Sequence, residues 1–132
     1  ATHPESPMNT PVWMLFANGA IGMVALLHLY FLVLEMFFWN KPLGRRIFRL
    51  TPEFAQASAA LAANQGLYNG FLAGGLFWGL LLGSAGFGIK VFFLGCIIVA
   101  GVFGALTVSR KILWVQALPG VVALALLLLS NA

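Results

Sequence analysis

The sequence predicts an all-α integral membrane protein, a four-helix bundle, on the strength of three observations. Of its 132 residues, 61% are hydrophobic and 8% are charged, and the mean hydropathy is +0.98. Soluble domains are about one-quarter charged. The apolar residues form runs long enough to cross a bilayer, and the basic residues gather in the short connections between these runs. With twelve Phe and only three acidic residues, a water-soluble surface could not be built.

The apolar runs divide the chain into four segments within one membrane domain, residues 1–132. We expect spans at about 12–39, 60–83, 88–108 and 112–130, with the tail 1–11 outside the bundle. The first run is longer than the roughly 30 Å hydrocarbon core requires, so it should tilt or project. The tail has no basic region and no small-residue cleavage pattern, so we do not expect a cleaved signal peptide.

The second helix should begin before its span. "TPEF" is typical of a helix start, with Thr51 as N-cap, Pro52 in the first position and Glu53 near the positive end of the helix dipole. We expect one long helix from there to about Gly83, beginning at the cytoplasmic interface. "GSAGFG" and "SRK" should form the two later turns, and Pro119 should kink the last helix.

The basic residues predict the orientation. Of the seven Lys and Arg residues, all but Lys90 lie in the first and third connections. The positive-inside rule places loops 40–50 and 109–111 in the cytoplasm, which puts both termini outside. This topology fits a multi-pass protein of a bacterial inner membrane.

Glycines line the second helix at four-residue spacing: Gly66, Gly70 and Gly74, then Gly75, Gly79 and Gly83. Small residues at this spacing let a neighbouring helix backbone approach closely. We expect close packing within the bundle, and the alternative is a homo-oligomer formed through these glycine faces.

"HLYFLVLEMFFW" places a histidine and a carboxylate at membrane depth. A charge there costs about 2.5–3.5 kcal/mol on insertion scales, so Glu35 needs a partner, a proton or water. Seven residues are nearly two helical turns, so His28 and Glu35 should share a face about 10 Å apart along the axis. A side chain of another helix, a water or a ligand should lie between them.

Other hydrogen-bonding side chains occur in the second and fourth helices. The segment "NQGLYNG" brings four within six residues, and the last helix adds one more; the set is Asn64, Gln65, Tyr68, Asn69 and Gln116. On the predicted topology they all fall toward the cytoplasmic half of the bundle. We therefore expect them to converge with His28 and Glu35 in one polar cavity.

Each of these residues also has a structural explanation. Glu35 is close enough to the inner boundary to pair with Arg45, Arg46 or Arg110. His28 could be a neutral core histidine bonded to an amide. The amide cluster could serve only to hold helices together.

Several kinds of site are poorly supported. His28 and Glu35 supply at most two metal ligands and His3 lies in the tail, so we expect no metal and no cofactor. The single cysteine, Cys96, cannot form an intrachain disulfide, and no catalytic triad or phosphate-binding loop is present. The basic residues serve orientation, so we expect no nucleic-acid partner.

Three stretches together are similar to a known family. "LLHLYFLVLEMFFW", "LAANQGLYNGFLAGGLFWGLLL" and "LGCIIVAGVFGALTVSRKILWVQALPG" resemble the DUF1304 family of small bacterial multipass membrane proteins, over about residues 12–125. The "LEMF" and "NQGLYNG" blocks are distinctive rather than compositional. The resemblance implies a four-span membrane domain, and it supplies no catalytic residues because the family has no assigned function.

Three functions fit these residues. The first is a small proton-coupled transporter, with Glu35 as the coupling residue and the amides and Tyr68 contacting a small molecule or lipid. The second is a membrane enzyme that uses His28 and Glu35 as acid and base on an apolar substrate, and whether the protein is an enzyme is left open. The third is an accessory subunit in which the polar groups only fix helix packing. We favour a small-molecule-binding membrane protein, with transport first.

Overall fold

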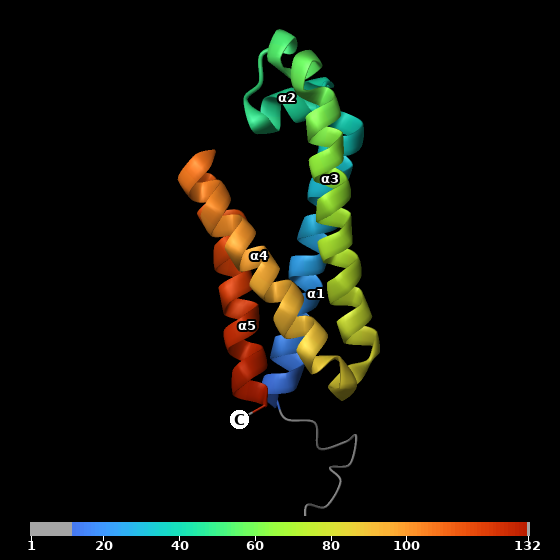
Figure 1. The fold of residues 1–132 in the computed structure, drawn as a ribbon, viewed down its shortest axis with the longest axis vertical. Coiled ribbons are helices and arrows are strands. Elements are labelled where there is room, and N and C mark those ends of the chain that lie inside the picture. The colour runs from blue at the N-terminus through green and yellow to red at the C-terminus, as the bar shows by residue number, and fades with distance from the viewer. Residues whose placement is uncertain (1–11, 132) are drawn as a thin grey trace, which may run out of the picture.

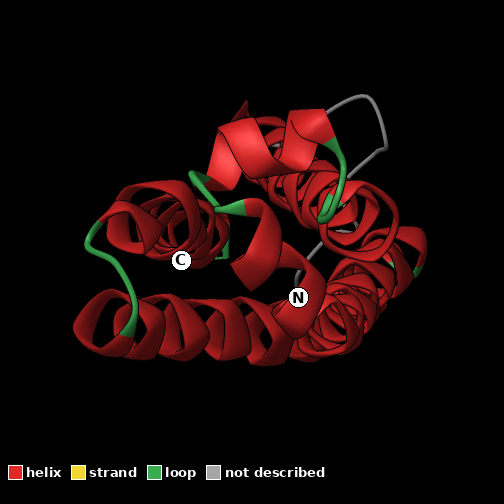
Figure 2. Ribbon diagram, turned by 90° about the horizontal axis from the view of Figure 1, so that it is seen from above, coloured by secondary structure: helices red, strands yellow, loops and turns green. Residues whose placement is uncertain are grey.

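The fold consists of helices and short connections. A computed structural model describes residues 12–131, in which no strand occurs (Figures 1 and 2). The expectation for the tail 1–11 lies outside the described residues. The elements in order are α1 (Val12–Val33), η2 (Leu34–Phe38), α2 (Pro42–Phe48), α3 (Pro52–Leu81), η3 (Gly83–Gly86), α4 (Phe87–Thr107), η4 (Leu113–Ala117) and α5 (Leu118–Ser130).

Three helical segments among residues 12–131 are long and apolar enough to cross a membrane: Val12–Phe38, Gly83–Thr107 and Leu113–Ser130. The longest α-helix, α3, has 30 residues and lies alongside α1, but it is not among these three (Figure 1). Its hydropathy is lower because it carries Asn64, Gln65 and Asn69. The protein is therefore an all-α, multi-pass membrane protein with lipid-facing apolar helices.

The predicted start of the long helix is confirmed in detail. Thr51 is the N-cap in extended conformation, Pro52 begins the helix, and the Thr51 hydroxyl accepts a hydrogen bond from the Phe54 amide at 3.2 Å. At the other end the chain turns through Gly83, whose φ of +60° favours glycine, into the 3₁₀ turn η3. The expected "GSAGFG" turn is thus present.

The segment expected to be a simple basic connection contains a helix, α2. Pro42 follows the extended residue Lys41 and occupies the first turn, a position where proline starts a helix rather than breaking it. Gly44 fits directly against η2, because a Cβ atom there would lie 2.0 Å from the Phe38 carbonyl oxygen. The Trp39 and Phe48 rings also pack together at 4.8 Å between centroids. These contacts hold α2 against the end of the first span.

The buried core lies at one end of the bundle. It comprises Ala17, Ile21, Val24 and Ala25 of α1, Leu76 of α3, Leu94 and Ile97 of α4, and Ala123 and Leu127 of α5. These residues lie in the half of the molecule nearer the η3 turn. Toward the other end, the α4–α5 hairpin leans away from α1, α2 and α3 (Figure 1). All four long helices are therefore packed together in one half and separate into two pairs in the other.

Candidate functional site

Two short π-helical segments interrupt the membrane helices, η2 within the first span and η4 at the start of the last. Each carries one of the predicted polar residues, Glu35 in η2 and Gln116 in η4. π-Helical turns are rare and occur often at functional sites. The expectation for Pro119 was a kink of the last helix, and the structure places the π-helical segment η4 immediately before α5, whose second residue is Pro119. Pro119 has no amide hydrogen to bond the carbonyl four residues back, which weakens the α-helical pattern there.

His28 is completely buried, and both of its ring nitrogens have partners. Nδ1 donates to the Val24 carbonyl at 2.8 Å, since a carbonyl can only accept. In the neutral ring Nε2 is then the acceptor, and Gln116 Nε2 donates to it at 3.2 Å. The pair joins α1 to η4 across the bundle. It is the geometry expected of a neutral core histidine bonded to an amide.

Glu35 bonds to a different helix. Its Oε1 accepts a hydrogen bond of 2.5 Å from Asn69 Nδ2 of α3, and the side chain is only partly buried. Among residues 12–131, the hydrogen-bond partner of this carboxylate is thus a neutral amide. The structural alternative was an ion pair with Arg45, Arg46 or Arg110. An amide satisfies part of the hydrogen-bonding capacity of a carboxylate without neutralising its charge. The site can therefore take a proton or a cation.

Two glycines of α3 bring Asn69 within reach of Glu35. A Cβ atom at Gly66 would lie 2.8 Å from Met36 Cγ and 3.1 Å from Glu35 Cβ, and one at Gly70 would lie 2.6 Å from Leu32 Cδ1. These separations are closer than normal contact, so glycine favours this approach of α3 to the first span. The requirement is stricter at Gly66, where a Cβ atom would also lie 3.2 Å from the Leu32 carbonyl oxygen, than at Gly70, where the end of the Leu32 side chain can rotate away. The first part of the glycine pattern serves packing inside the chain.

The second part of the pattern is used in the same way against α4. A Cβ atom at Gly75 would meet the Phe93 ring at 2.3 Å, and one at Gly79 would meet Lys90 Cγ at 2.8 Å. Gly74 and Gly83 have nothing within 4 Å of such an atom among the described residues. Four of the six predicted glycines therefore pack within the bundle, and they do not form a free oligomer face.

The remaining polar residues of α3 do not join this pair. Asn64, Gln65 and Tyr68 are exposed on the helix surface, whereas Asn69 is buried. Of the four α3 side chains expected to converge on His28 and Glu35, the structure brings Asn69 to Glu35 and leaves the other three on the helix surface. Tyr68 is seven residues before Gly75 and so lies on nearly the same face of α3, the face turned to α4. It is exposed because α4 has moved away at that level.

Lys90 is a buried polar residue that the sequence interpretation used only as an orientation signal. It is 2% exposed, and its Nζ donates to Asn18 Oδ1 at 3.2 Å and to the Gly83 carbonyl at 3.4 Å. It thus joins α4 to α1 and to the turn after α3. The sequence offered one indication of this burial. Asn18 is a polar residue near the start of the first span, and Lys90 is near the start of the third, so both lie close to the same end of the bundle.

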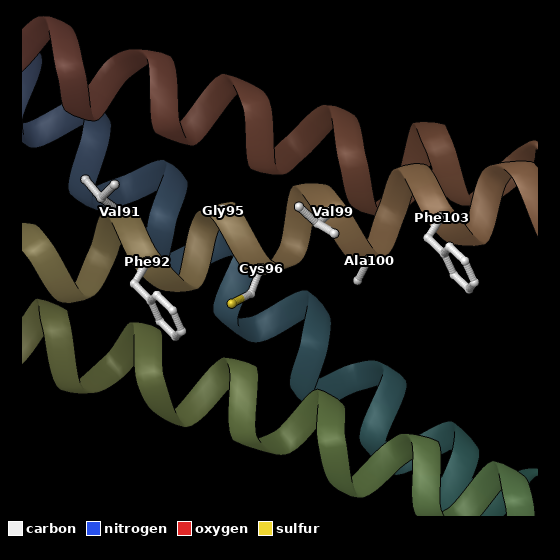
Figure 3. A pocket seen from close by; sticks show the side chains of 7 residues that line it. All are labelled: Val91, Phe92, Gly95, Cys96, Val99, Ala100 and Phe103. Atoms are coloured by element: carbon white, nitrogen blue, oxygen red, sulfur yellow. The ribbon is translucent and has the colours of Figure 1, made fainter.

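Two open apolar grooves mark the surface. One, of about 670 Å³, follows α4 and is lined by residues between Val91 and Phe103 (Figure 3). The other, of about 570 Å³, lies over α1 and α5 and includes Phe16, Gly19 and Leu126. Neither is lined by the His28–Gln116 or Glu35–Asn69 pairs. Among residues 12–131 no group of three or more His, Cys, Asp or Glu side chains is close enough to hold a metal.

The His28–Gln116 contact can be tested by a double-mutant cycle with His28→Leu and Gln116→Leu. We expect a coupling free energy of about 0.6 kcal/mol and no more than about 1.7, the range found for interhelical hydrogen bonds in membranes. The measurement is the free energy of unfolding in mixed micelles. Strictly additive effects of the two changes would contradict the contact.

Comparison with known proteins identifies one family over most of the chain. The family described as "Protein of unknown function (DUF1304)" matches residues 22–128. The "Uncharacterized protein YpaA" of Lactococcus lactis subsp. lactis (strain IL1403) is 34% identical over 96 residues, which cover 71% of this chain and 81% of the relative. No solved structure matches. The chain belongs to the DUF1304 family.

Proposed function

We propose that α3 is the fourth membrane span, in a bundle with both termini outside and loops 40–50 and 109–111 in the cytoplasm. The support is geometric. The side chains of η2 and α4 fill the positions over Gly66 and Gly79, so α3 shares the depth of two apolar helices over much of its length. The exposed basic residues Lys41, Arg46, Arg110 and Lys111 also lie in the two loops that this topology assigns to the cytoplasm.

We further propose that the protein binds a small organic molecule carrying a positive charge, with Glu35 as its counter-ion. The observation that carries this proposal is the environment of Glu35, a partly exposed carboxylate in a membrane span whose side-chain partner is the amide of Asn69. Such a group is expensive to keep in lipid without a function. Exposed Gln65 and Tyr68 lie one turn or less from Asn69 on α3 and add hydrogen-bonding groups.

Proton-coupled transport is the form of this function that we favour. A carboxylate that binds either a proton or a cation exchanges one for the other, and exchange across a membrane is how small carriers couple the two. The four-helix chain would then present Glu35 alternately to the two sides. The α4–α5 hairpin leans away from the other helices in the half of the molecule where α2 lies, whereas the buried core packs all of them together in the other half (Figure 1).

The rival functions make different use of the same residues. An acid–base enzyme would need substrate to reach His28, and both of its nitrogens bond to protein groups in a completely buried position. An accessory subunit is favoured by one observation: among residues 12–131 no buried side-chain nitrogen or oxygen lacks a hydrogen-bond partner. It is therefore the second candidate.

Binding of the lipophilic cation tetraphenylphosphonium tests the proposal. We expect the purified protein to bind it at about pH 8 and to lose affinity as the pH falls, because protonation removes the negative charge of Glu35. Glu35→Gln should weaken binding about 30-fold or more, as expected when one member of a buried charge pair is removed. Isothermal titration calorimetry in detergent gives the affinities.

Glu53→Gln is the matched control. Glu53 is exposed in the first turn of α3, so this variant removes the same charge away from the proposed site. It should bind the cation as the wild type does. Equal binding of tetraphenylphosphonium by the wild type and Glu35→Gln would contradict the cation site, and so would no binding by either protein at both pH values. The accessory-subunit function would then be favoured.

A further inference from the structure

The groove along α4 has the shape of a site for an extended chain. Phe92, Cys96, Ala100 and Phe103 follow each other at three- or four-residue spacing, so they form one face of the helix. Figure 3 shows these side chains projecting from α4 on the side where α3 lies. From Phe92 to Phe103 the groove follows twelve residues, roughly 17 Å along the helix at 1.5 Å per residue.

The groove leads to a positively charged end of the molecule. Phe103 is one turn from the end of α4, and the chain continues through exposed Ser109, Arg110 and Lys111. The α2 segment, with exposed Arg46 and Arg49 beside it, lies at the same end of the molecule (Figure 1). An apolar channel that ends at basic side chains is complementary to an acyl chain that ends in a phosphate.

The second groove provides an internal comparison. It is similarly apolar and only slightly smaller, but it lies over the first half of α1, around Gly19 and Met23. In the described part of the chain, the basic residue nearest that end is Lys90, which is buried and bonded to Asn18 and Gly83. Any lipid tail could lie in either groove, but only the α4 groove has basic residues where the headgroup would be.

We propose that the α4 groove is a binding site for an anionic phospholipid, with an acyl chain along Phe92–Phe103 and the phosphate at Arg110 and Lys111. This inference goes beyond the proposed cation site and does not use Glu35. The acyl chain of the lipid would lie along α4 alone, because every residue that lines the groove belongs to that helix.

Native mass spectrometry tests the proposal with phosphatidylglycerol and phosphatidylcholine of identical acyl chains. We expect the wild type to retain phosphatidylglycerol preferentially. Changing Arg110→Gln and Lys111→Gln together should reduce that preference about 25-fold, since each basic residue near a membrane surface contributes about fivefold. Gly95→Phe should reduce retention of both lipids about tenfold or more, because the ring fills the groove.

Gly19→Phe is the matched control for bulk. Gly95 and Gly19 each line one groove, and a Cβ atom at either would have nothing within 4 Å, so neither substitution forces a clash with the helices. Gly19→Phe should leave the preference for phosphatidylglycerol unchanged. If Gly95→Phe does not fold, Ala100→Leu narrows the same groove with less added volume.

Three results would overturn the proposal. These are equal retention of the two lipids by the wild type, a preference for phosphatidylglycerol that is unchanged when Arg110 and Lys111 are both changed to Gln, and a loss of phosphatidylglycerol retention in Gly19→Phe as large as that in Gly95→Phe. Glu35→Gln should retain the lipid as the wild type does. A failure of the cation-binding proposal can therefore be distinguished from a failure of the lipid-site proposal.

Discussion

Gly86→Ala is expected to destabilise the protein by about 2–3 kcal/mol, at the upper end for overpacking. A Cβ atom at Gly86 would lie 2.0 Å from the carbonyl oxygen of Gly79 and 2.8 Å from its carbonyl carbon. The obstacle is backbone, so no side chain can rotate to relieve it, and α3 must move away from the turn. Thermal or denaturant unfolding in mixed micelles measures the loss.

Gly88→Ala is the control for this change. Gly88 lies two residues further on in the first turn of α4, and a Cβ atom there would meet nothing within 4 Å. Alanine favours a helix over glycine by about 0.5–1 kcal/mol, so this variant should be as stable as the wild type or slightly more so. Equal destabilisation by the two changes would show that steric contact with Gly79 is not the cause.

Asn69→Leu is expected to destabilise the protein by about 1.5–3 kcal/mol at about pH 8, the range for a hydrogen bond to a charged group. It leaves the ionised Glu35 carboxylate without its amide donor at membrane depth. The loss should be smaller at about pH 5, since a protonated Glu35 carries no charge to desolvate. Stability therefore falls with rising pH in this variant relative to the wild type.

Asn64→Leu provides the comparison on the same helix. Asn64 is exposed on α3, so its replacement should change stability by no more than about 0.5 kcal/mol, with no dependence on pH. Unfolding of both variants at the two pH values distinguishes them. A pH-independent loss in Asn69→Leu would mean that Glu35 keeps one protonation state between the two pH values, and it would contradict the proposed pH dependence of cation binding.

Much of the fold could be predicted because the determining signals are local. The Thr51 cap and Pro52 define the start of α3 within four residues of sequence, and the turn at Gly83 follows from its glycine. The polar residues His28, Glu35, Asn69 and Gln116 also stand out, because amides and charges are rare in apolar runs. Composition alone was enough to indicate the membrane.

The partners of those residues depended on long-range packing. Spacing placed Asn64, Gln65, Tyr68 and Asn69 together, but which of them faces the first span is decided by the contact of Gly66 with η2. The burial of Lys90 likewise depends on Asn18, 72 residues away in the chain. The helix α2 within loop 40–50 is missed for a local reason, since a proline after an apolar run is typical of a helix break, whereas Pro42 begins a helix.

The π-helical turn at Leu34–Phe38 divides the first span into two parts, and the side chains that follow the turn are rotated about the helix axis relative to those that precede it. A π-helical turn holds one residue more than an α-helical turn, and one residue corresponds to about 100° of rotation. The part before η2 directs His28 toward η4, and the part containing η2 directs Glu35 toward α3. A single continuous helix can therefore serve two different neighbours with residues only seven positions apart, and the loss of one residue from η2 would turn every side chain beyond it toward the wrong helix.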